Sequence, residues 1–169
     1  GMVTPETIYD CENGRFRVAD VTIKDVHASQ ELSTADILKD SSNIGMTKIG
    51  LDLGAKTYWE YLRRLGFGQK LGLPLPGQNT GILRSAGAWT KVDLAAASFG
   101  QGFSVTLPQL AQAYLCLIND GIMRPLRLVL RPERDPAPEV RVFKRDVART
   151  VRAILGQVVE GGTGTRARI

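Results

Sequence analysis

Helix-start signals are the feature that most constrains the fold of this chain. Three polar motifs each place a Ser or Thr three residues before an acidic or amide side chain, as in a capping box: Ser33–Asp36, Thr90–Asp93 and Thr106–Gln109. We expect a helix after each motif. Further helices are expected to begin within residues 41–43 and to span about 56–65 and 144–160. The chain is therefore predicted to be mostly helical.

The helix after Thr106 has the clearest apolar periodicity. Val105 and Leu110 are placed for a hydrophobic staple, and Gly121 marks the end. Helical spacing predicts a buried stripe formed by Leu107, Leu110, Ala111, Tyr114, Leu115 and Ile118.

Strand signals are few. Residues 3–26 are predicted to form short strands and loop around a turn at Glu12–Gly14. A strand pair is expected within 122–143, around the proline-rich turn 131–139, and residues 72–81 form a Pro/Gly loop. A complete α/β enzyme needs a central sheet to carry its helices, and five convincing strands cannot be found. The predicted fold class is mostly α with minor β and an incomplete central sheet, so that the helices form one layer of something larger.

Charge and composition exclude several classes of protein. The net charge is +5, but the basic residues are scattered, and the stretch from Arg124 to Arg134 alternates with Leu and Val. This pattern favours a solvated sheet face over a phosphate-binding stripe, and no nucleic-acid partner is expected. No run of 18 apolar residues is present, so the chain itself is expected to be soluble.

Metal and cofactor sites are not predicted. Cys11 and Cys116 are far apart in sequence, no CxxC motif occurs, and His27 is the one histidine. The two cysteines could pair, although two free thiols are favoured. His27 is expected to be structural or exposed.

The stretch KDSSNIG, residues 39–45, allows two interpretations. Unpaired N–H groups at a helix start favour Ser and Asn, so the motif could be a simple cap. It could also hold hydroxyl and amide groups at a rigid helix entrance beside a cleft. There they could relay a proton or bind a peptide carbonyl, but they could not activate themselves.

A wider pattern favours the second interpretation. KDSSNIGMTKIG, YLRRLGFGQKLGLPLPGQ and SFGQGFSVTLPQLAQAYLCLINDG follow one another in the chain, preceded by CENGRFR and IKDVHASQELSTADIL. In this order and spacing, over roughly residues 8–169, they resemble the class B penicillin-binding proteins. These are peptidoglycan D,D-transpeptidases with a β-lactamase/transpeptidase-like fold, and the division-type members are the most similar.

The resemblance implies roles for one active-site motif. The family uses SxxK, which carries the attacking serine and its lysine, then SxN, then KTG. Ser41-Ser42-Asn43 matches SxN, so Ser41 would join the proton relay. Asn43 would hydrogen-bond the substrate backbone or the catalytic lysine, and Ser42 would be the variable middle residue.

The other two motifs are not found. No serine is followed three residues later by lysine, and GTGT at 162–165 lacks the lysine of KTG and follows a predicted helix. We interpret GTGT as a helix-terminating loop. It is not a phosphate-binding P-loop either, since that motif also needs a lysine. Residues 1–169 are thus expected to be the middle of one transpeptidase domain, and Gly1 to be an expression scar. Within this domain 3–26 would be the lead-in, 31–121 the helical subdomain, 122–143 the strand pair and 144–160 a helix.

The resemblance also implies partners and location. The parent would act on peptidoglycan stem peptides, be trapped by β-lactams and join the cell-division machinery. It would be anchored in the bacterial cytoplasmic membrane with its catalytic domain outside. No cofactor is expected. The fragment alone would be inactive without SxxK and KTG.

Other interpretations stay open. The chain could be a helical partner-binding module with SxN as a cap, or a relative of the serine β-lactamases. Gly100, Gln101 and Gly102 could shape the floor of a substrate cleft or merely connect two helices. Trp59 and Trp89 are more often core or rim residues than substrate platforms.

Overall fold

The computed structural model describes residues 3–129 and 138–168, and these divide into two compact units. Unit 1 comprises residues up to 58, 85–102 and from 153 onward, and unit 2 comprises 59–84 and 103–152. Much of the proline-rich turn predicted at 131–139 lies outside the described residues.

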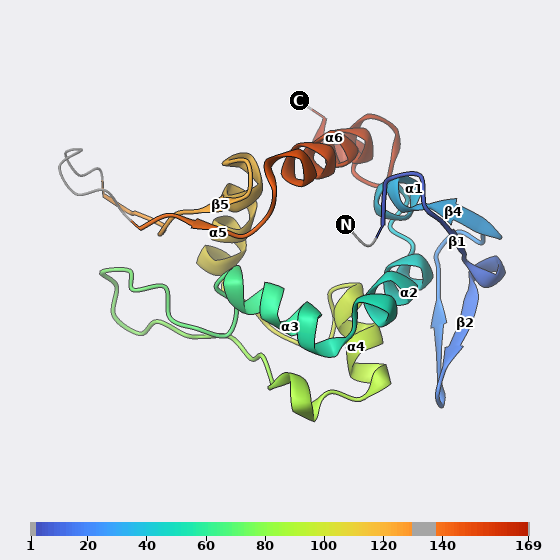
Figure 1. The fold of residues 1–169 in the computed structure, drawn as a ribbon, viewed down its shortest axis with the longest axis horizontal. Helices are drawn as coiled ribbons and strands as arrows, with labels where there is room; N and C mark the ends of the chain where they lie inside the picture. The colour runs from blue at the N-terminus through green and yellow to red at the C-terminus, as the bar shows by residue number, and fades with distance from the viewer. Residues whose placement is uncertain (1–2, 130–137, 169) are drawn as a thin grey trace. The chain divides into compact units, whose positions relative to one another are not determined.

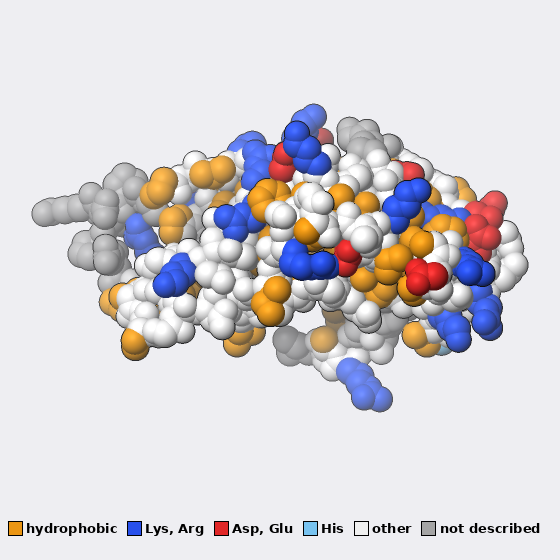
Figure 2. Space-filling view, turned by 90° about the horizontal axis from the view of Figure 1, so that it is seen from below, with side chains coloured by type: hydrophobic (Ala, Val, Ile, Leu, Met, Phe, Trp, Pro, Cys, Tyr) orange, Lys and Arg blue, Asp and Glu red, His pale blue; other side chains and the backbone are white. Residues whose placement is uncertain are grey.

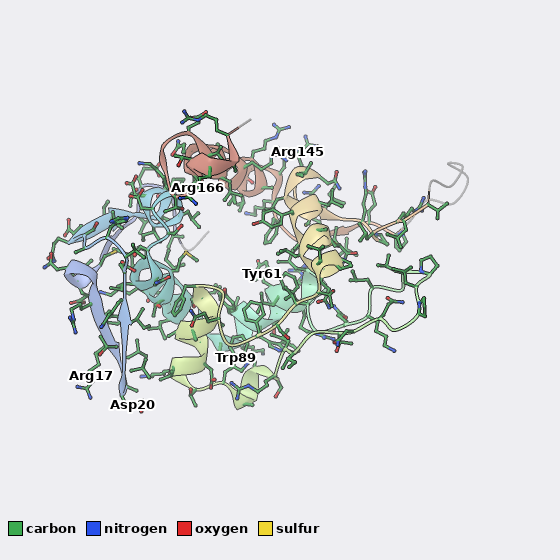
Figure 3. All side chains as sticks on the ribbon, turned by 180° about the vertical axis from the view of Figure 1, so that it is seen from behind. Arg17, Asp20, Tyr61, Trp89, Arg145 and Arg166 are labelled. Carbon is green, nitrogen blue, oxygen red and sulfur yellow. The ribbon has the colours of Figure 1, made fainter. Side chains whose placement is uncertain are left out.

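Unit 1 combines short strand pairs with helices. The strands β1 (Ile8–Asp10) and β4 (Glu31–Ser33) pair antiparallel, as do β2 (Arg15–Val18) and β3 (Val21–Lys24). Figure 1 shows β2 in a long hairpin, and Figure 3 shows Arg17 and Asp20 at its tip. The predicted turn is a short 3₁₀ helix, η1 (Glu12–Gly14), in which all three residues have positive φ.

The helices of unit 1 begin close to where the caps predict. They are α1 (Thr34–Lys39), α2 (Asn43–Leu53), the start of α3 (Ala55–Arg64), α4 (Lys91–Ser98) and the end of α6 (Arg145–Gly161). Two 3₁₀ turns are η2 (Ala86–Ala88) and η3 (Thr165–Ala167). Thr90 and Asp93 form the full capping box. At the start of α1, Ser33 accepts from the Asp36 N–H, but its hydroxyl then donates to the Asp36 carboxylate.

The core of unit 1 lies where β1–β4 meet α1, α2 and α4. Its buried side chains are Cys11, Val18, Ile23, Ile37, Ile44 and Ala95. Two helices approach closely at Gly50, where a Cβ atom would lie 1.8 Å from Ser98 Oγ. Gly50 is therefore a packing position, and the α2–α4 contact leaves no room for a side chain there.

Unit 2 contains the rest of α3, the helix α5 (Leu107–Ile118), the strand pair β5 (Ile122–Met123) and β6 (Val140–Arg141), and the first half of α6. Thr106 and Gln109 form the predicted capping box. Residues 65–81 carry no helix or strand, as the Pro/Gly loop predicts for 72–81.

The predicted buried stripe of α5 is wrong. Its large apolar side chains are 39–79% exposed: Leu107, Leu110, Tyr114, Leu115 and Ile118. The buried residues are Gln109, Gln112 and Cys116 on another face. The Gln109 amide donates to the carbonyls of Gly66, Gln69 and Thr80. A polar side chain can be buried when its hydrogen bonds are made, and here Gln109 fixes the irregular loop that packs on α5.

Among the described residues, strands occur only in two-stranded sheets, and helices carry most of the regular structure. This confirms the predicted fold class. No described helix is both long and apolar enough to cross a bilayer. Both cysteines are buried and free, as favoured above. Figure 2 shows Lys and Arg side chains in small groups on the face it draws, separated by hydrophobic and uncharged surface.

Candidate functional site

The Ser41-Ser42-Asn43 segment forms the sharp turn between α1 and α2 in unit 1. Ser41 has a positive φ of 57°, Ser42 is the N-cap of α2 and Asn43 is the first residue of that helix. A non-glycine residue with this backbone conformation is uncommon, so the surrounding contacts must hold the turn in place. The three side chains have very different environments.

Ser42 is a buried cap. Its side chain accepts a hydrogen bond from the Gly45 N–H at 2.9 Å and donates to Asp25 Oδ2 at 2.6 Å, with 4% of the residue exposed. The Cys11 sulfur lies 3.7 Å away. Burial raises the pKa of the Cys11 thiol, and the hydrogen bond from Ser42 acts in the opposite, weaker direction. Ser42 thus has the geometry of a helix cap, and a role in substrate binding stays a prediction.

Asn43 has its side-chain orientation fixed by the backbone. Its Nδ2 donates to the carbonyl oxygen of Lys24 at 2.9 Å. Because a carbonyl only accepts, the amide must turn its NH₂ group toward Lys24. Nothing among residues 3–129 and 138–168 donates to Oδ1 of Asn43. The side chain therefore presents an acceptor, with one N–H left over.

Ser41 is paired with a distant residue. Its hydroxyl lies 2.8 Å from that of Thr163, in the GTGT turn that follows α6. The Thr163 N–H also approaches the Lys39 carbonyl at 3.4 Å. A Cβ atom on Gly162 would lie 2.5 Å from that carbonyl, so the turn packs directly on the end of α1 (Figure 1). The predicted helix-terminating loop is present, and it also reaches the SxN segment.

The contact of Thr163 with Ser41 was not predicted from the sequence. The two residues are 122 positions apart, and neither position carries a local signal for the other.

A polar cavity of about 360 Å³ opens at this turn within unit 1. Its lining includes two carboxylates, Asp25 and Asp40, and no Lys or Arg. The full lining is Asp25, Val26, His27, Ser29, Leu32, Asp40, Ser41, Ser42, Gly161, Gly162 and Thr163. Ser41 and Ser42 thus border the cavity, whereas Asn43 does not. His27 is exposed at its edge, as expected.

The cavity has recognition groups rather than an activated nucleophile. Ser41 faces the hydroxyl of Thr163, and a second hydroxyl is not a base that could deprotonate it. Next to the cavity, and not in its lining, Asn43 offers an amide oxygen as an acceptor on the same turn as the Ser41 hydroxyl. Such groups can orient a donor or relay a proton, but the covalent step needs a partner. No described cluster of His, Cys, Asp or Glu is suited to hold a metal.

The remaining candidate residues lie elsewhere. Gly100, Gln101 and Gly102 are exposed in the connector after α4, with positive φ at both glycines, and they do not line the cavity. Their role in substrate binding stays a prediction. Trp89 is half-buried and packs at 6.3 Å from Tyr58, and Trp59 donates its indole N–H to the Arg84 carbonyl. Both have the packing roles that were favoured.

Comparisons with known proteins agree over nearly the whole chain. The family model for the penicillin binding protein transpeptidase domain matches residues 1–168. A probable peptidoglycan D,D-transpeptidase, PbpC of Pseudomonas aeruginosa, is 41% identical over 150 residues, 88% of this chain and 26% of that protein. The peptidoglycan D,D-transpeptidase FtsI of Escherichia coli is 34% identical over 155 residues, 91% of this chain and 26% of that protein. The chain therefore spans about a quarter of these curated relatives.

Solved structures show the same likeness. The transpeptidase domain of penicillin-binding protein 3 from Burkholderia pseudomallei has a TM-score of 0.95 at 34% identity, covering 99% of this chain and 51% of that one. Penicillin-binding protein 3 from Mycobacterium tuberculosis, in complex with aztreonam, has a TM-score of 0.89 at 29% identity, covering 99% and 41%.

Proposed function

This chain belongs to the penicillin-binding protein transpeptidase family, and on that premise we propose that it supplies the second active-site motif of a peptidoglycan D,D-transpeptidase. Ser41 and Asn43 are its functional side chains. The attacking serine with its lysine, and the KTG lysine, are supplied by sequence other than these 169 residues. The observation that carries the proposal is the turn at 41–43, where the SxN match is held rigidly beside a polar cavity.

The reaction proceeds in two steps. The attacking serine adds to the penultimate D-Ala carbonyl of a stem peptide, the bond to the terminal D-Ala breaks, and that residue leaves with a proton. An amine of a neighbouring strand then attacks the ester, forms the cross-link and returns the serine hydroxyl. Each step moves a proton, so a relay beside the serine lowers both barriers.

The geometry of the chain gives each residue a part in these steps. The Lys24 carbonyl turns the Asn43 NH₂ group toward itself and leaves Oδ1 as an acceptor, which suits the ammonium of the catalytic lysine. The Ser41 hydroxyl both donates and accepts, and Thr163 keeps it at the cavity wall. Ser41 can therefore pass a proton, while Oδ1 of Asn43 holds the ammonium of the catalytic lysine in place.

Substrate class and cellular role follow from the family. β-Lactams mimic the D-Ala-D-Ala donor and trap the acyl-enzyme, and the aztreonam complex of the Mycobacterium tuberculosis relative supports binding of such compounds. We further propose, as membership of the family implies, that the parent is anchored in the membrane with its catalytic domain outside the cytoplasm, and that it serves cell division in contact with the division machinery. The names of the curated relatives favour a transpeptidase over the β-lactamase alternative.

The test is labelling with a fluorescent penicillin. The full-length protein that contains this chain should be labelled covalently, and Asn43→Ala or Ser41→Ala should slow labelling about a hundredfold, the scale of losing one preorganised catalytic group. The 169-residue chain alone should take no label. An unlabelled full-length protein contradicts the proposed function, and stable label on Ser41 of the isolated chain contradicts the inactivity of the fragment.

A further inference from the structure

We propose that Asp25 is a positioning residue of this active site: its carboxylate holds the Ser41-Ser42-Asn43 turn from the end of β3 and thereby aims Ser41 and Asn43. The proposal rests on the proposed function, because it assigns Asp25 a part in the acylation that Ser41 and Asn43 assist.

Both carboxylate oxygens of Asp25 bind the start of α2. Oδ2 accepts from the Ser42 hydroxyl at 2.6 Å, and Oδ1 accepts from the Ile44 N–H at 3.0 Å. The first turn of a helix leaves several N–H groups without partners, and its positive end favours a carboxylate. Ser42 already satisfies the Gly45 N–H, so Asp25 adds a second and independent anchor.

Lys24, the last residue of β3, and Asp25, the residue after it, hold neighbouring residues of the motif. The Lys24 carbonyl accepts from Asn43 Nδ2, while Asp25 binds Ser42 and Ile44 on either side of it. The Asp25 N–H in turn donates to the Gly14 carbonyl at 3.2 Å, so its backbone is fixed by the η1 turn. The position of the motif is therefore set by the β2–β3 hairpin as well as by α2.

The turn needs such an anchor because Ser41 has an unfavourable backbone. A left-handed conformation is unfavourable at a non-glycine residue, and the turn would relax if its contacts were released. A helix cap alone does not require Asp25. Thr90, at the start of α4 in the same unit, forms a full capping box with Asp93, and both residues belong to that helix start.

The competing explanation is that Asp25 only stabilises the fold. Thr90→Ala provides the matched control, since it removes a helix cap from unit 1 without touching the motif. Loss of fold lowers the fraction of protein that can be labelled. Misplacement of Ser41 and Asn43 lowers the rate constant of the molecules that remain folded, because small displacements of assisting groups slow catalysis steeply.

The experiment compares Asp25→Asn, Asp25→Ala and Thr90→Ala in the full-length protein. Acylation by a fluorescent penicillin is followed in time, with the final labelled fraction and the first-order rate constant fitted separately, and melting temperature is measured in parallel. We expect Asp25→Ala to lower the rate constant about ten- to a hundredfold. Asp25→Asn keeps an acceptor for the Ile44 N–H and should have a smaller effect. Thr90→Ala should lower the melting temperature and leave the rate constant unchanged.

The outcomes separate the two proposals. A wild-type rate constant in Asp25→Asn and Asp25→Ala overturns the positioning role, as does a fall in the rate constant that Thr90→Ala reproduces. If Asp25→Ala does not fold, the comparison of Asp25→Asn with Thr90→Ala decides in the same way. A wild-type protein that takes no label contradicts the proposed function, and the positioning role with it. Labelled wild type with unaffected rate constants in both Asp25→Asn and Asp25→Ala contradicts the positioning role alone.

Discussion

The helices α2 of unit 1 and α5 of unit 2 begin with the same kind of cap but differ in which side chains they bury. Ser42 and Thr106 each accept from the N–H three residues on. Beyond the cap, α2 packs Ile44 and its small residues into the core, whereas α5 buries Gln109, Gln112 and Cys116 and leaves Leu107, Leu110 and Leu115 exposed. A cap therefore tells where a helix starts and nothing about which face will be covered.

The starts of α2 and α5 also differ in the contacts that hold them. The start of α2 is held from outside by Asp25, Lys24 and, through Ser41, by Thr163. The start of α5 is held by Gln109, whose amide also organises the loop 65–81. In unit 1 the anchored Ser41 and Ser42 border a cavity, and in unit 2 the anchored Gln109 shapes a loop.

Among the changes considered, substitution of Gln109 should lower the free energy of unfolding most, because it removes what distinguishes the start of α5 from that of α2. Gln109→Ala removes the donors that satisfy the carbonyls of Gly66, Gln69 and Thr80, and the residue is fully buried. Leaving buried groups unpaired should lower the free energy of unfolding by about 3 kcal/mol, measured by urea denaturation of the 169-residue chain. Leu107→Gln is the control: Leu107 is 79% exposed, so the change should stay within about 0.5 kcal/mol. A larger loss of unfolding free energy in Leu107→Gln than in Gln109→Ala would show that the apolar stripe of α5 is the buried face after all.

Local signals were sufficient for the start of each capped helix. Thr90 with Asp93 and Thr106 with Gln109 act within one turn, so their sequence spacing determines the contact. The same holds for the shortage of strands and for Ser42 as a cap. The order of motifs along the chain was enough to identify the family, because the resemblance uses residue types and spacing rather than packing.

Burial and long-range contacts could not be predicted in this way. Leu107, Leu110, Tyr114, Leu115 and Ile118 of α5 have helical spacing, yet Gln109 on another face is the residue that finds hydrogen-bond partners in loop 65–81. Thr163 reaches Ser41 across 122 positions, and Asp25 reaches Ser42 across 17. Such contacts depend on how the tertiary fold brings distant segments together, and no local sequence pattern contains that information.

Substitution of Thr163 should have a smaller effect on stability and tests the anchor at the start of α2. Thr163→Val keeps the shape of the side chain and removes the hydroxyl that pairs with Ser41, so unit 1 should lose about 1 kcal/mol of unfolding free energy, again by urea denaturation. Thr163→Ser keeps the hydroxyl and should lose less. In a double-mutant cycle, Thr163→Val should cost little once Ser41→Ala has removed the partner. Equal costs in both backgrounds would show that the hydrogen bond contributes nothing.

The smallest expected effect concerns the other end of α5 and depends on pH. Hydrogen bonds from Arg152 and Arg149 lower the pKa of Asp120 below its usual value of 3.8, and Arg145 lies 3.3 Å from the same carboxylate. Arg152 also donates to the carbonyls of Leu117 and Ile118, the last residues of α5. Because the folded form prefers the ionised carboxylate, its contribution to stability is complete above the usual pKa. That contribution is lost as the pH falls through the lowered value.

Urea midpoints measured at pH 7 and at steps down to pH 3 should therefore fall more for the wild type than for Asp120→Asn, which has no carboxylate to protonate. Solvent screening keeps the effect small, since the arginines are largely exposed, and added salt should reduce it further. Tyr9 provides the contrast in unit 1: burial raises the pKa of its phenol, so it stays neutral throughout this range and contributes no slope. A wild type and an Asp120→Asn variant with parallel pH profiles would show that the arginines hold the end of α5 through the backbone carbonyls alone.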